Sequence, residues 1–141
     1  MSLEFVDTNV LLYAYDVTAG DRHHRARTLV GRLGRLRTGA LSVQVLQEFY
    51  VNAVRKIAVP LSPAAARERL EVLALWPAHS PAAHDVLAAV DISVQERISF
   101  WDGMIIRSAS ALGCEILWTE DLNDGQNING VQVRNPFAVD Q

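Results

Sequence analysis

Four carboxylates lie in or beside the predicted strands and helices of this chain, three of them where an element begins or ends. Asp7 closes a short apolar run, and Asp121 follows another near the end of the sequence. Glu48 falls inside a helix-like stretch, and Asp102 stands near the start of a second one. In open α/β sheets, ligands bind just outside the carboxyl ends of the strands. Carboxylates that converge there from distant parts of a chain have one common use, which is to hold a divalent metal.

The elements that must position these side chains alternate between strands and helices. Apolar runs and periodicity predict strands at 3–6, 40–42, 76–79, 115–118 and 131–134, although Pro77 is unfavourable inside the third. They predict helices at 9–14, 21–37, 43–57, 64–75, 80–97 and 101–112. Ser42 and Ser62 are suited to start helices, and Gly113 to end one. This order predicts an α/β fold, with a parallel sheet covered by helices on both faces.

Length and composition indicate one domain spanning 1–141, with no repeat or linker to divide it. Cys114 is the only cysteine, so an internal disulfide is impossible, as expected of a cytoplasmic protein. We expect neither a signal peptide nor a membrane span. The formal net charge of −3 argues against a broad basic surface for nucleic acid. It does not exclude a nuclease, because a bound cation reverses the sign at an acidic site.

Each carboxylate also has a purely structural interpretation. Asp7 suits the N-cap of the following helix, and Asp102 stands three residues after Ser99, as in a capping box. Glu48 lies opposite the apolar stripe of its helix, where solvent is the usual neighbour. Asp121 belongs to a turn-forming segment. As a set they are harder to explain, because like charges about 5 Å apart repel by roughly 3 kcal/mol at an effective dielectric of about 20.

Four segments carry a resemblance to a known family. They are Phe5-Val6-Asp7-Thr8-Asn9-Val10-Leu11-Leu12, residues 41–49 around Glu48, Ser99-Phe100-Trp101-Asp102 with the apolar helix after it, and residues 116–122. Their order and spacing resemble the four acidic motifs of PIN-domain proteins, over almost the whole chain. Within that family, a domain of this size is most similar to the VapC-type ribonuclease toxins of type II toxin–antitoxin systems.

The resemblance implies a three-layer α/β/α fold with a short-stranded, five-stranded parallel sheet of order 3-2-1-4-5. It implies a metal-dependent endoribonuclease that uses Mg²⁺ or Mn²⁺, a homodimer, and a small antitoxin protein that blocks the acidic cleft. RNA is the implied substrate. The catalytic and metal-binding residues would be Asp7, Glu48, Asp102 and Asp121.

Several neighbouring residues would support this site. Thr8, Asn9 and Thr119 carry hydroxyl and amide groups that can orient the carboxylates. The fourth acidic position has two candidates, because Asp124 lies three residues after Asp121 in the same polar loop. The family pattern of threonine two residues before the aspartate favours Asp121, with Asp124 assisting.

Other conspicuous residues are open to two interpretations. The predicted helix at 21–37 forms either a solvated face or a phosphate-steering surface, with arginines at 22, 25, 27, 32, 35 and 37. We interpret His79 and His84 as incidental, because no carboxylate-rich sequence accompanies them. Trp101 and Trp118 flank site residues, and we interpret both as core residues rather than base-stacking platforms.

Two rival functions remain. One is a PIN-like module that binds RNA or protein without catalysis, although all four acidic positions are filled. The other is an Asp-dependent, phosphatase-like domain, which would want a second aspartate where this chain has Asn9. It would also need a lysine near the phosphate, whereas the only lysine, Lys56, is at the far end of a helix. Neither G-x-G-x-x-G nor a P-loop occurs.

Overall fold

The computed structural model describes residues 2–138, in which strands and helices alternate as the apolar pattern predicts. The strands are β1 (Glu4–Val6), β2 (Gly39–Ser42), β3 (Ala78–His79), β4 (Ile116–Trp118), β5 (Asn127–Ile128) and β6 (Val131–Arg134). The helices are α1 (Thr8–Tyr15), α2 (Asp21–Leu36), α3 (Val43–Arg55), α4 (Pro63–Leu73), α5 (Ala83–Glu96) and α6 (Phe100–Ala111).

The sheet has the order β3-β2-β1-β4-β6-β5, and its pairs are parallel except β5 with β6. The predicted order 3-2-1-4-5 is kept when Val131–Arg134, which is β6, is counted as the fifth strand. The prediction of five parallel strands is wrong in one respect, because β5 adds a sixth, antiparallel strand. Asn129 and Gly130 both have positive φ, at 51° and 81°, which is the geometry of a tight hairpin turn.

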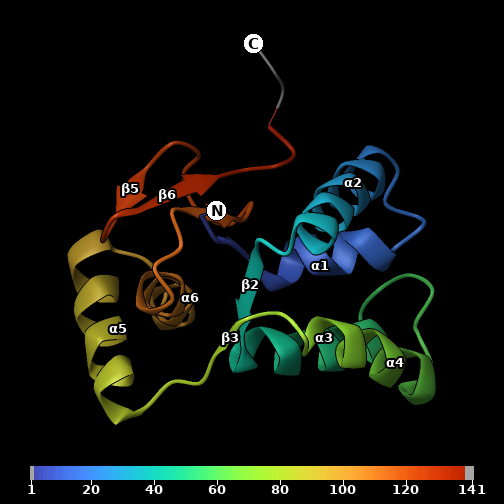
Figure 1. Ribbon diagram of the computed structural model, residues 1–141, viewed down its shortest axis with the longest axis horizontal. Coiled ribbons are helices and arrows are strands. Elements are labelled where there is room, and N and C mark those ends of the chain that lie inside the picture. The colour runs from blue at the N-terminus through green and yellow to red at the C-terminus, as the bar shows by residue number, and fades with distance from the viewer. Residues whose placement is uncertain (1, 139–141) are drawn as a thin grey trace.

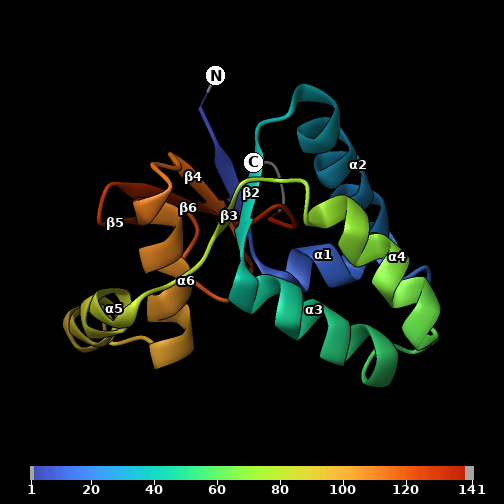
Figure 2. The same ribbon diagram turned by 60° about the horizontal axis from the view of Figure 1, so that its bottom comes forward.

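The helices form a layer on each side of the sheet, as expected. Figures 1 and 2 show α5 and α6 together on one side, and α1 to α4 on the other. Strands β1 and β4 lie in the middle of the sheet order, and Phe5, Val6 and Leu117 have no exposed surface. The rigid centre of the molecule is therefore the pair of strands whose carboxyl ends carry Asp7 and Thr119. None of the helices within residues 2–138 is both long and apolar enough to cross a membrane.

Serine caps fix the start of three helices. The hydroxyl of Ser42 accepts a hydrogen bond from the Val45 N–H at 3.3 Å, and Ser62 caps α4 through the Ala65 N–H at 3.1 Å. Ser99 caps α6 in the same way, through the N–H of Asp102 at 3.0 Å. These bonds satisfy N–H groups that the first turn of a helix leaves without partners. The helix starts predicted at Ser42 and Ser62 are confirmed.

A glycine sets the distance between α5 and α6. A Cβ atom on Gly103 would lie 2.6 Å from the Ala89 carbonyl oxygen and 3.4 Å from the Ser93 Cβ. Only a residue without a side chain therefore allows this approach. The contact also fixes the rotation of α6, because the face that carries Gly103 must be turned toward α5.

Candidate active site

Parallel pairing of β1 with β4 brings the first acidic residue beside the last motif. Val6 is opposite Trp118, so Asp7 and Thr119 follow as neighbours at the carboxyl edge of the sheet. The Asp7 N–H donates to the Trp118 carbonyl oxygen at 3.0 Å. The Thr119 hydroxyl donates to Asp7 Oδ2 at 2.8 Å, and the Thr8 N–H donates to Asp7 Oδ1 at 2.7 Å. Asp7 therefore caps α1, as its structural interpretation predicts, and also faces the cleft.

Three of the four predicted carboxylates meet at this edge. Asp7, Asp102 and Asp121 each offer an oxygen atom that lies within 4.8 Å of the other two. Asp7 follows β1, Asp102 is in the first turn of α6, and Asp121 is in the loop after β4. They line a cavity of about 200 Å³, to which Glu48 and Trp101 also contribute. Residues more than a hundred positions apart are thus gathered around one small space.

The cleft is electrostatically unfavourable for carboxylates alone. Burial, with a smaller contribution from the charges of Asp121 and Glu48, raises the pKa of Asp7 from 3.8 to about 7. The hydrogen bonds from Thr119 and Thr8 lower this pKa but do not outweigh burial. Burial also raises the pKa of Asp102, again with the charges of Asp121 and Glu48 acting in the same direction. A cation at this position would offset both effects.

Glu48 reaches the cleft from α3 but stands outside the group of three. The Thr8 hydroxyl donates to its Oε2 at 2.9 Å, and Gln44 Nε2 donates to its Oε1 at 2.8 Å. Both carboxylate oxygens are therefore held in place. Sequence reasoning missed Gln44, although its position four residues before Glu48 puts both side chains on one helix face.

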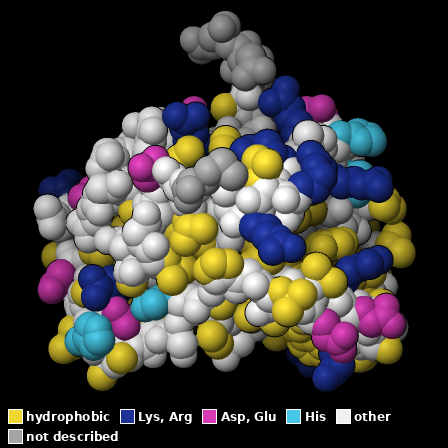
Figure 3. Space-filling model, viewed as in Figure 1, with side chains coloured by type: hydrophobic (Ala, Val, Ile, Leu, Met, Phe, Trp, Pro, Cys, Tyr) yellow, Lys and Arg dark blue, Asp and Glu magenta, His cyan; other side chains and the backbone are white. Residues whose placement is uncertain are grey.

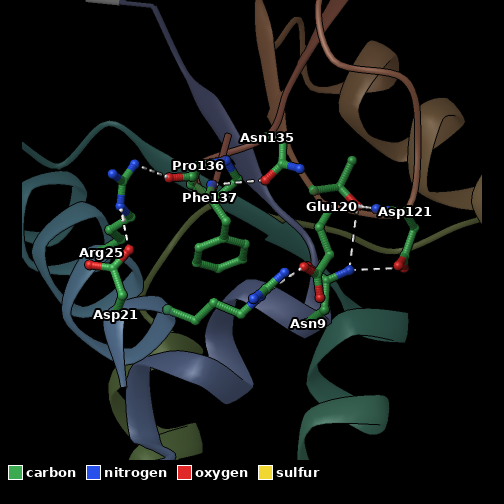
Figure 4. A network of polar contacts seen from close by, with 10 residues as sticks. Asn9, Asp21, Arg25, Glu120, Asp121, Asn135, Pro136 and Phe137 are labelled. Carbon is green, nitrogen blue, oxygen red and sulfur yellow. Dashed lines mark hydrogen bonds and ion pairs between the residues drawn. The ribbon is translucent and has the colours of Figure 1, made fainter. Parts of the chain in front are cut away.

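Asn9 and Thr119 position the fourth carboxylate. Asn9 Nδ2 donates to Asp121 Oδ2 at 2.8 Å, and Figure 4 shows this contact. The Thr119 hydroxyl accepts from the Asp121 N–H at 3.1 Å, while it donates to Asp7. Asp124 is not brought to the cavity: it is exposed, and its Oδ1 accepts from the Asn135 N–H at 2.9 Å. The structure therefore places Asp121, and not Asp124, beside the other carboxylates.

The loop that carries Asp121 is tied to α2 and to the C-terminal segment. Glu120 accepts from Arg22 Nε at 3.2 Å, and the Arg22 guanidinium lies 5.4 Å from the centre of the Phe137 ring. Phe137 in turn packs edge-on against Tyr13, with ring centres 5.2 Å apart. Helix α2 and the C-terminal segment thus fix the residue next to Asp121 in the chain.

The arginines of α2 have mixed roles. Figure 3 shows Lys and Arg side chains gathered on the side where Figure 1 places α2. Arg22, Arg25 and Arg32 form ion pairs with Glu120, Asp21 and Glu4, respectively. Arg25 also donates to the backbone carbonyl of Pro136, as Figure 4 shows. Structural contacts therefore account for these three arginines, and phosphate steering stays a prediction for the other three.

The expectation that His79 and His84 lack carboxylate company is wrong, because both lie near Asp85, which α5 supplies. Buried Asp85 lies 3.6 Å from His79 Nε2 and 3.5 Å from His84 Nε2, and Arg107 donates to it at 2.8 Å. The Ala82 backbone N–H and Arg107 lower the pKa of Asp85. This cluster joins β3, α5 and α6, away from the acidic cavity.

The interpretation of Trp101 as a core residue was also wrong. Its side chain is 63% exposed and borders the acidic cavity, because α6 turns its apolar face to the sheet and to α5. Trp118 is partly buried against the core, and its Nε1 donates to Glu4 Oε1 at 2.9 Å.

Solved structures share this arrangement of elements. A toxin-antitoxin complex from Klebsiella pneumoniae matches with a TM-score of 0.69 and 19% identity, over 96% of this chain and 99% of that chain. VapBC2 from Rickettsia felis, bound to a DNA fragment from the promoter, matches with a TM-score of 0.65 and 16% identity, over 94% and 98%. FitAcB from Neisseria gonorrhoeae matches with a TM-score of 0.64 and 20% identity, over 97% and 100%. At such identities the likeness shows the fold.

The family of the chain follows from a match to a family model and not to a single protein. A search of curated protein sequences found no match. The family model of the PIN domain, however, matches residues 5–123, which include Asp7, Glu48, Asp102 and Asp121. Because this match covers most of the sequence, the chain belongs to the PIN-domain family.

Proposed function

We propose that this protein is a metal-dependent endoribonuclease of the VapC type, which hydrolyses phosphodiester bonds in RNA. The observation that carries the proposal is the meeting of Asp7, Asp102 and Asp121 within 4.8 Å at the carboxyl edge of the sheet. Membership of the PIN-domain family and the fold shared with chains of toxin–antitoxin complexes support the same function.

The residues of the cleft fit a divalent cation. Every ligand atom they offer is a carboxylate oxygen, which suits Mg²⁺ or Mn²⁺ better than softer metals. Buried Asp7 keeps its charge at neutral pH only at a cost, which a cation would remove. When bound, the ion would lower the pKa of a water molecule and offset negative charge at the scissile phosphate.

The side chains of the protein have separate roles in this proposal. Asp7, Asp102 and Asp121 hold the cation, and Asn9 and Thr119 keep Asp121 and Asp7 in place by hydrogen bonds. Glu48, held by Thr8 and Gln44, accepts a proton from the attacking water. Water attacks phosphorus in line as the bond to the 3′ oxygen breaks. That oxygen takes up a proton from solvent, so the products are a 5′-phosphate and a 3′-hydroxyl.

The partners follow from the same proposal. RNA is the substrate, a small antitoxin protein covers the acidic cleft, and the active form is a homodimer in the cytoplasm. An antitoxin would keep the nuclease inactive until growth must stop. Binding of such a protein to the purified chain, with loss of cleavage, is the result that would support this part.

The direct test is cleavage of total cellular RNA by purified, refolded protein with Mg²⁺, Mn²⁺ or EDTA. We expect cutting that needs the metal and is abolished in Asp7→Asn, while the control Asp91→Asn, at an exposed position on α5, cuts normally. Refolding removes any bound inhibitor. Absence of cutting in every condition would instead favour a non-catalytic binding module, and cutting by a well-folded Asp7→Asn would refute the assignment of the site.

A further inference from the structure

Trp101 is the most exposed aromatic side chain beside the acidic cavity. It precedes Asp102 directly, and 63% of its surface is open to solvent. Its backbone carbonyl accepts from Gln44 Nε2 at 3.5 Å, and its ring packs edge-on against Phe100, with centres 5.1 Å apart. The indole is thus held at the rim of the cavity without being covered.

The rotation of α6 separates this ring from the packing of α5. Gly103 faces α5, and a residue two positions earlier is turned by about 200° around the helix axis. Trp101 is therefore directed away from α5 and toward the cleft. The exposed apolar residues of α5, which are Val86, Leu87, Val90 and Val94, belong to a different face.

A polar stripe on α3 continues from this rim through the cleft. Gln44, Glu48 and Asn52 follow one another at intervals of four residues along one side of the helix, and Lys56, the C-cap residue, continues the same spacing. From Gln44 to Lys56 the helix axis covers about 18 Å, several times the roughly 3.4 Å step of a stacked nucleotide strand.

The cavity itself also extends toward Lys56. A second hollow of about 340 Å³ contains Lys56 and Tyr13, and it shares Asn9, Leu12 and Asn52 with the acidic cavity. The one carboxylate that lines this second hollow, Asp16, already accepts hydrogen bonds from the backbone N–H and the hydroxyl of Thr18. Within residues 2–138, Lys56 forms no ion pair, so its charge is free to meet a phosphate.

We propose that single-stranded RNA lies along this groove, with an unpaired base stacked on Trp101 and a backbone phosphate held by Lys56. The proposal deepens, and rests on, the proposed ribonuclease function. An exposed indole can stack only on a base that has left its neighbours, which loops and single strands supply and duplexes do not. The carboxylates lie between the two contacts, where the scissile phosphate would sit.

The chemistry of the groove suits an RNA strand at both of its ends. The aromatic ring adjoins the residues that would hold the reacting phosphate, so the next nucleotide of a bound strand is within reach of it. The one lysine of the chain, Lys56, lies at the end of the groove away from Trp101 and supplies the positive charge that binding of a phosphate needs. The exposed apolar surface that a contact with a second copy of the chain would favour is instead on α5.

The test measures RNA binding apart from cleavage, with Asp7→Asn as the background so that the RNA stays intact. The probes are a short, labelled single-stranded RNA of mixed sequence and the same RNA annealed to its complement. Anisotropy gives the affinity, and quenching of tryptophan fluorescence reports stacking. Trp101→Ala should weaken single-strand binding about 10-fold and abolish most of the quenching, whereas Trp101→Phe should keep the affinity within about 3-fold.

Two further variants complete the design. Lys56→Gln should weaken binding and lower the salt dependence by about one phosphate contact. Arg67→Gln is its control, because Arg67 is exposed on α4 and lines neither hollow. Leu75→Ala, an exposed apolar residue 85% open to solvent, is the control for Trp101→Ala. Neither control should change the affinity.

Unchanged single-strand affinity and quenching in Trp101→Ala would overturn the proposal. A change in self-association instead, measured by sedimentation, would assign Trp101 to a protein interface and also overturn it. Metal-dependent cutting of RNA by the wild-type protein is measured beside these variants. If cutting is present and the Trp101 and Lys56 effects are absent, only this inference fails; if the wild-type protein neither binds nor cuts RNA, the proposed function fails too.

Discussion

Removing the buried charge of Asp7 should stabilise the metal-free protein, and increasingly so as the pH rises. Burial raises the pKa of this carboxyl from 3.8 to about 7, so the folded protein holds the proton more tightly than the unfolded chain does. A raised carboxyl pKa contributes stability that is fully present below about pH 4 and is lost as the pH rises through about 7. The amide side chain introduced by Asp7→Asn does not ionise, so the variant escapes this loss.

The magnitude follows from the size of the pKa shift. Each pKa unit corresponds to about 1.4 kcal/mol, and full ionisation of Asp7 therefore costs about 4 kcal/mol at most. Between about pH 5 and about pH 8, the part of this cost that develops is about 2 to 3 kcal/mol. The variant also changes the hydrogen bond with Thr119, but that effect does not depend on pH and cancels between the two measurements.

The assay is urea denaturation in EDTA at the two pH values, for the wild-type protein, Asp7→Asn and the exposed control Asp91→Asn. The stability of Asp7→Asn relative to wild type should rise by about 2 to 3 kcal/mol from the lower to the higher pH, and that of Asp91→Asn should not. Mg²⁺ should stabilise the wild-type protein selectively, because only the folded state assembles the three carboxylates. Parallel pH dependence in wild type and Asp7→Asn would refute this account of Asp7.

Three more variants test other parts of the site and fold. Asn9→Ala removes the amide that holds Asp121, so the Mg²⁺ concentration needed for half-maximal cleavage should rise about 10-fold or more, as a metal titration of activity would reveal. Asp121→Asn should abolish RNA cleavage, whereas Asp124→Asn should cut at a rate within about 3-fold of wild type; equal loss in both would reject Asp121 as the single fourth carboxylate. Gly103→Ala should lower the free energy of unfolding by about 1 to 3 kcal/mol, because its Cβ would meet a backbone carbonyl of α5. Gly31→Ala on α2 is the control and should stabilise the protein slightly. A neutral result for Gly103→Ala in urea denaturation would contradict the close packing of α5 and α6.

The parts of the site that follow strand ends could be predicted from sequence. Asp7 and Thr119 each come directly after a strand, and neighbouring parallel strands bring such positions together whatever the details of packing. The same reasoning places Asp121 near them, two residues after Thr119. The starts of two helices could also be predicted from sequence. Ser42 and Ser62 each cap a helix through the N–H group three residues later, so the signal lies within a few neighbouring residues.

Other features depend on tertiary packing that the local sequence does not contain. Trp101 looks like a core residue until the close contact of Gly103 with α5 fixes the rotation of its helix. The cluster around Asp85 joins residues of three elements, so no short sequence motif predicts it. Strand β5 is only two residues long and is defined by its partner β6 rather than by any apolar pattern of its own.

The distance in sequence between Asp7 and Asp121 has a consequence for synthesis of the protein. The cleft needs oxygen atoms from both ends of the chain, and Asn9 holds Asp121 directly. A nascent chain that has not yet released β4 from the ribosome lacks one wall of the cleft and one of its three clustered carboxylates. If the protein cuts RNA as proposed, fragments that end before Asp121, made by a nonsense mutation or interrupted translation, should therefore leave the RNA of the cell uncut. Under the proposed ribonuclease function, late completion of the site would protect the ribosome and its message until β4 and the loop after it have been translated.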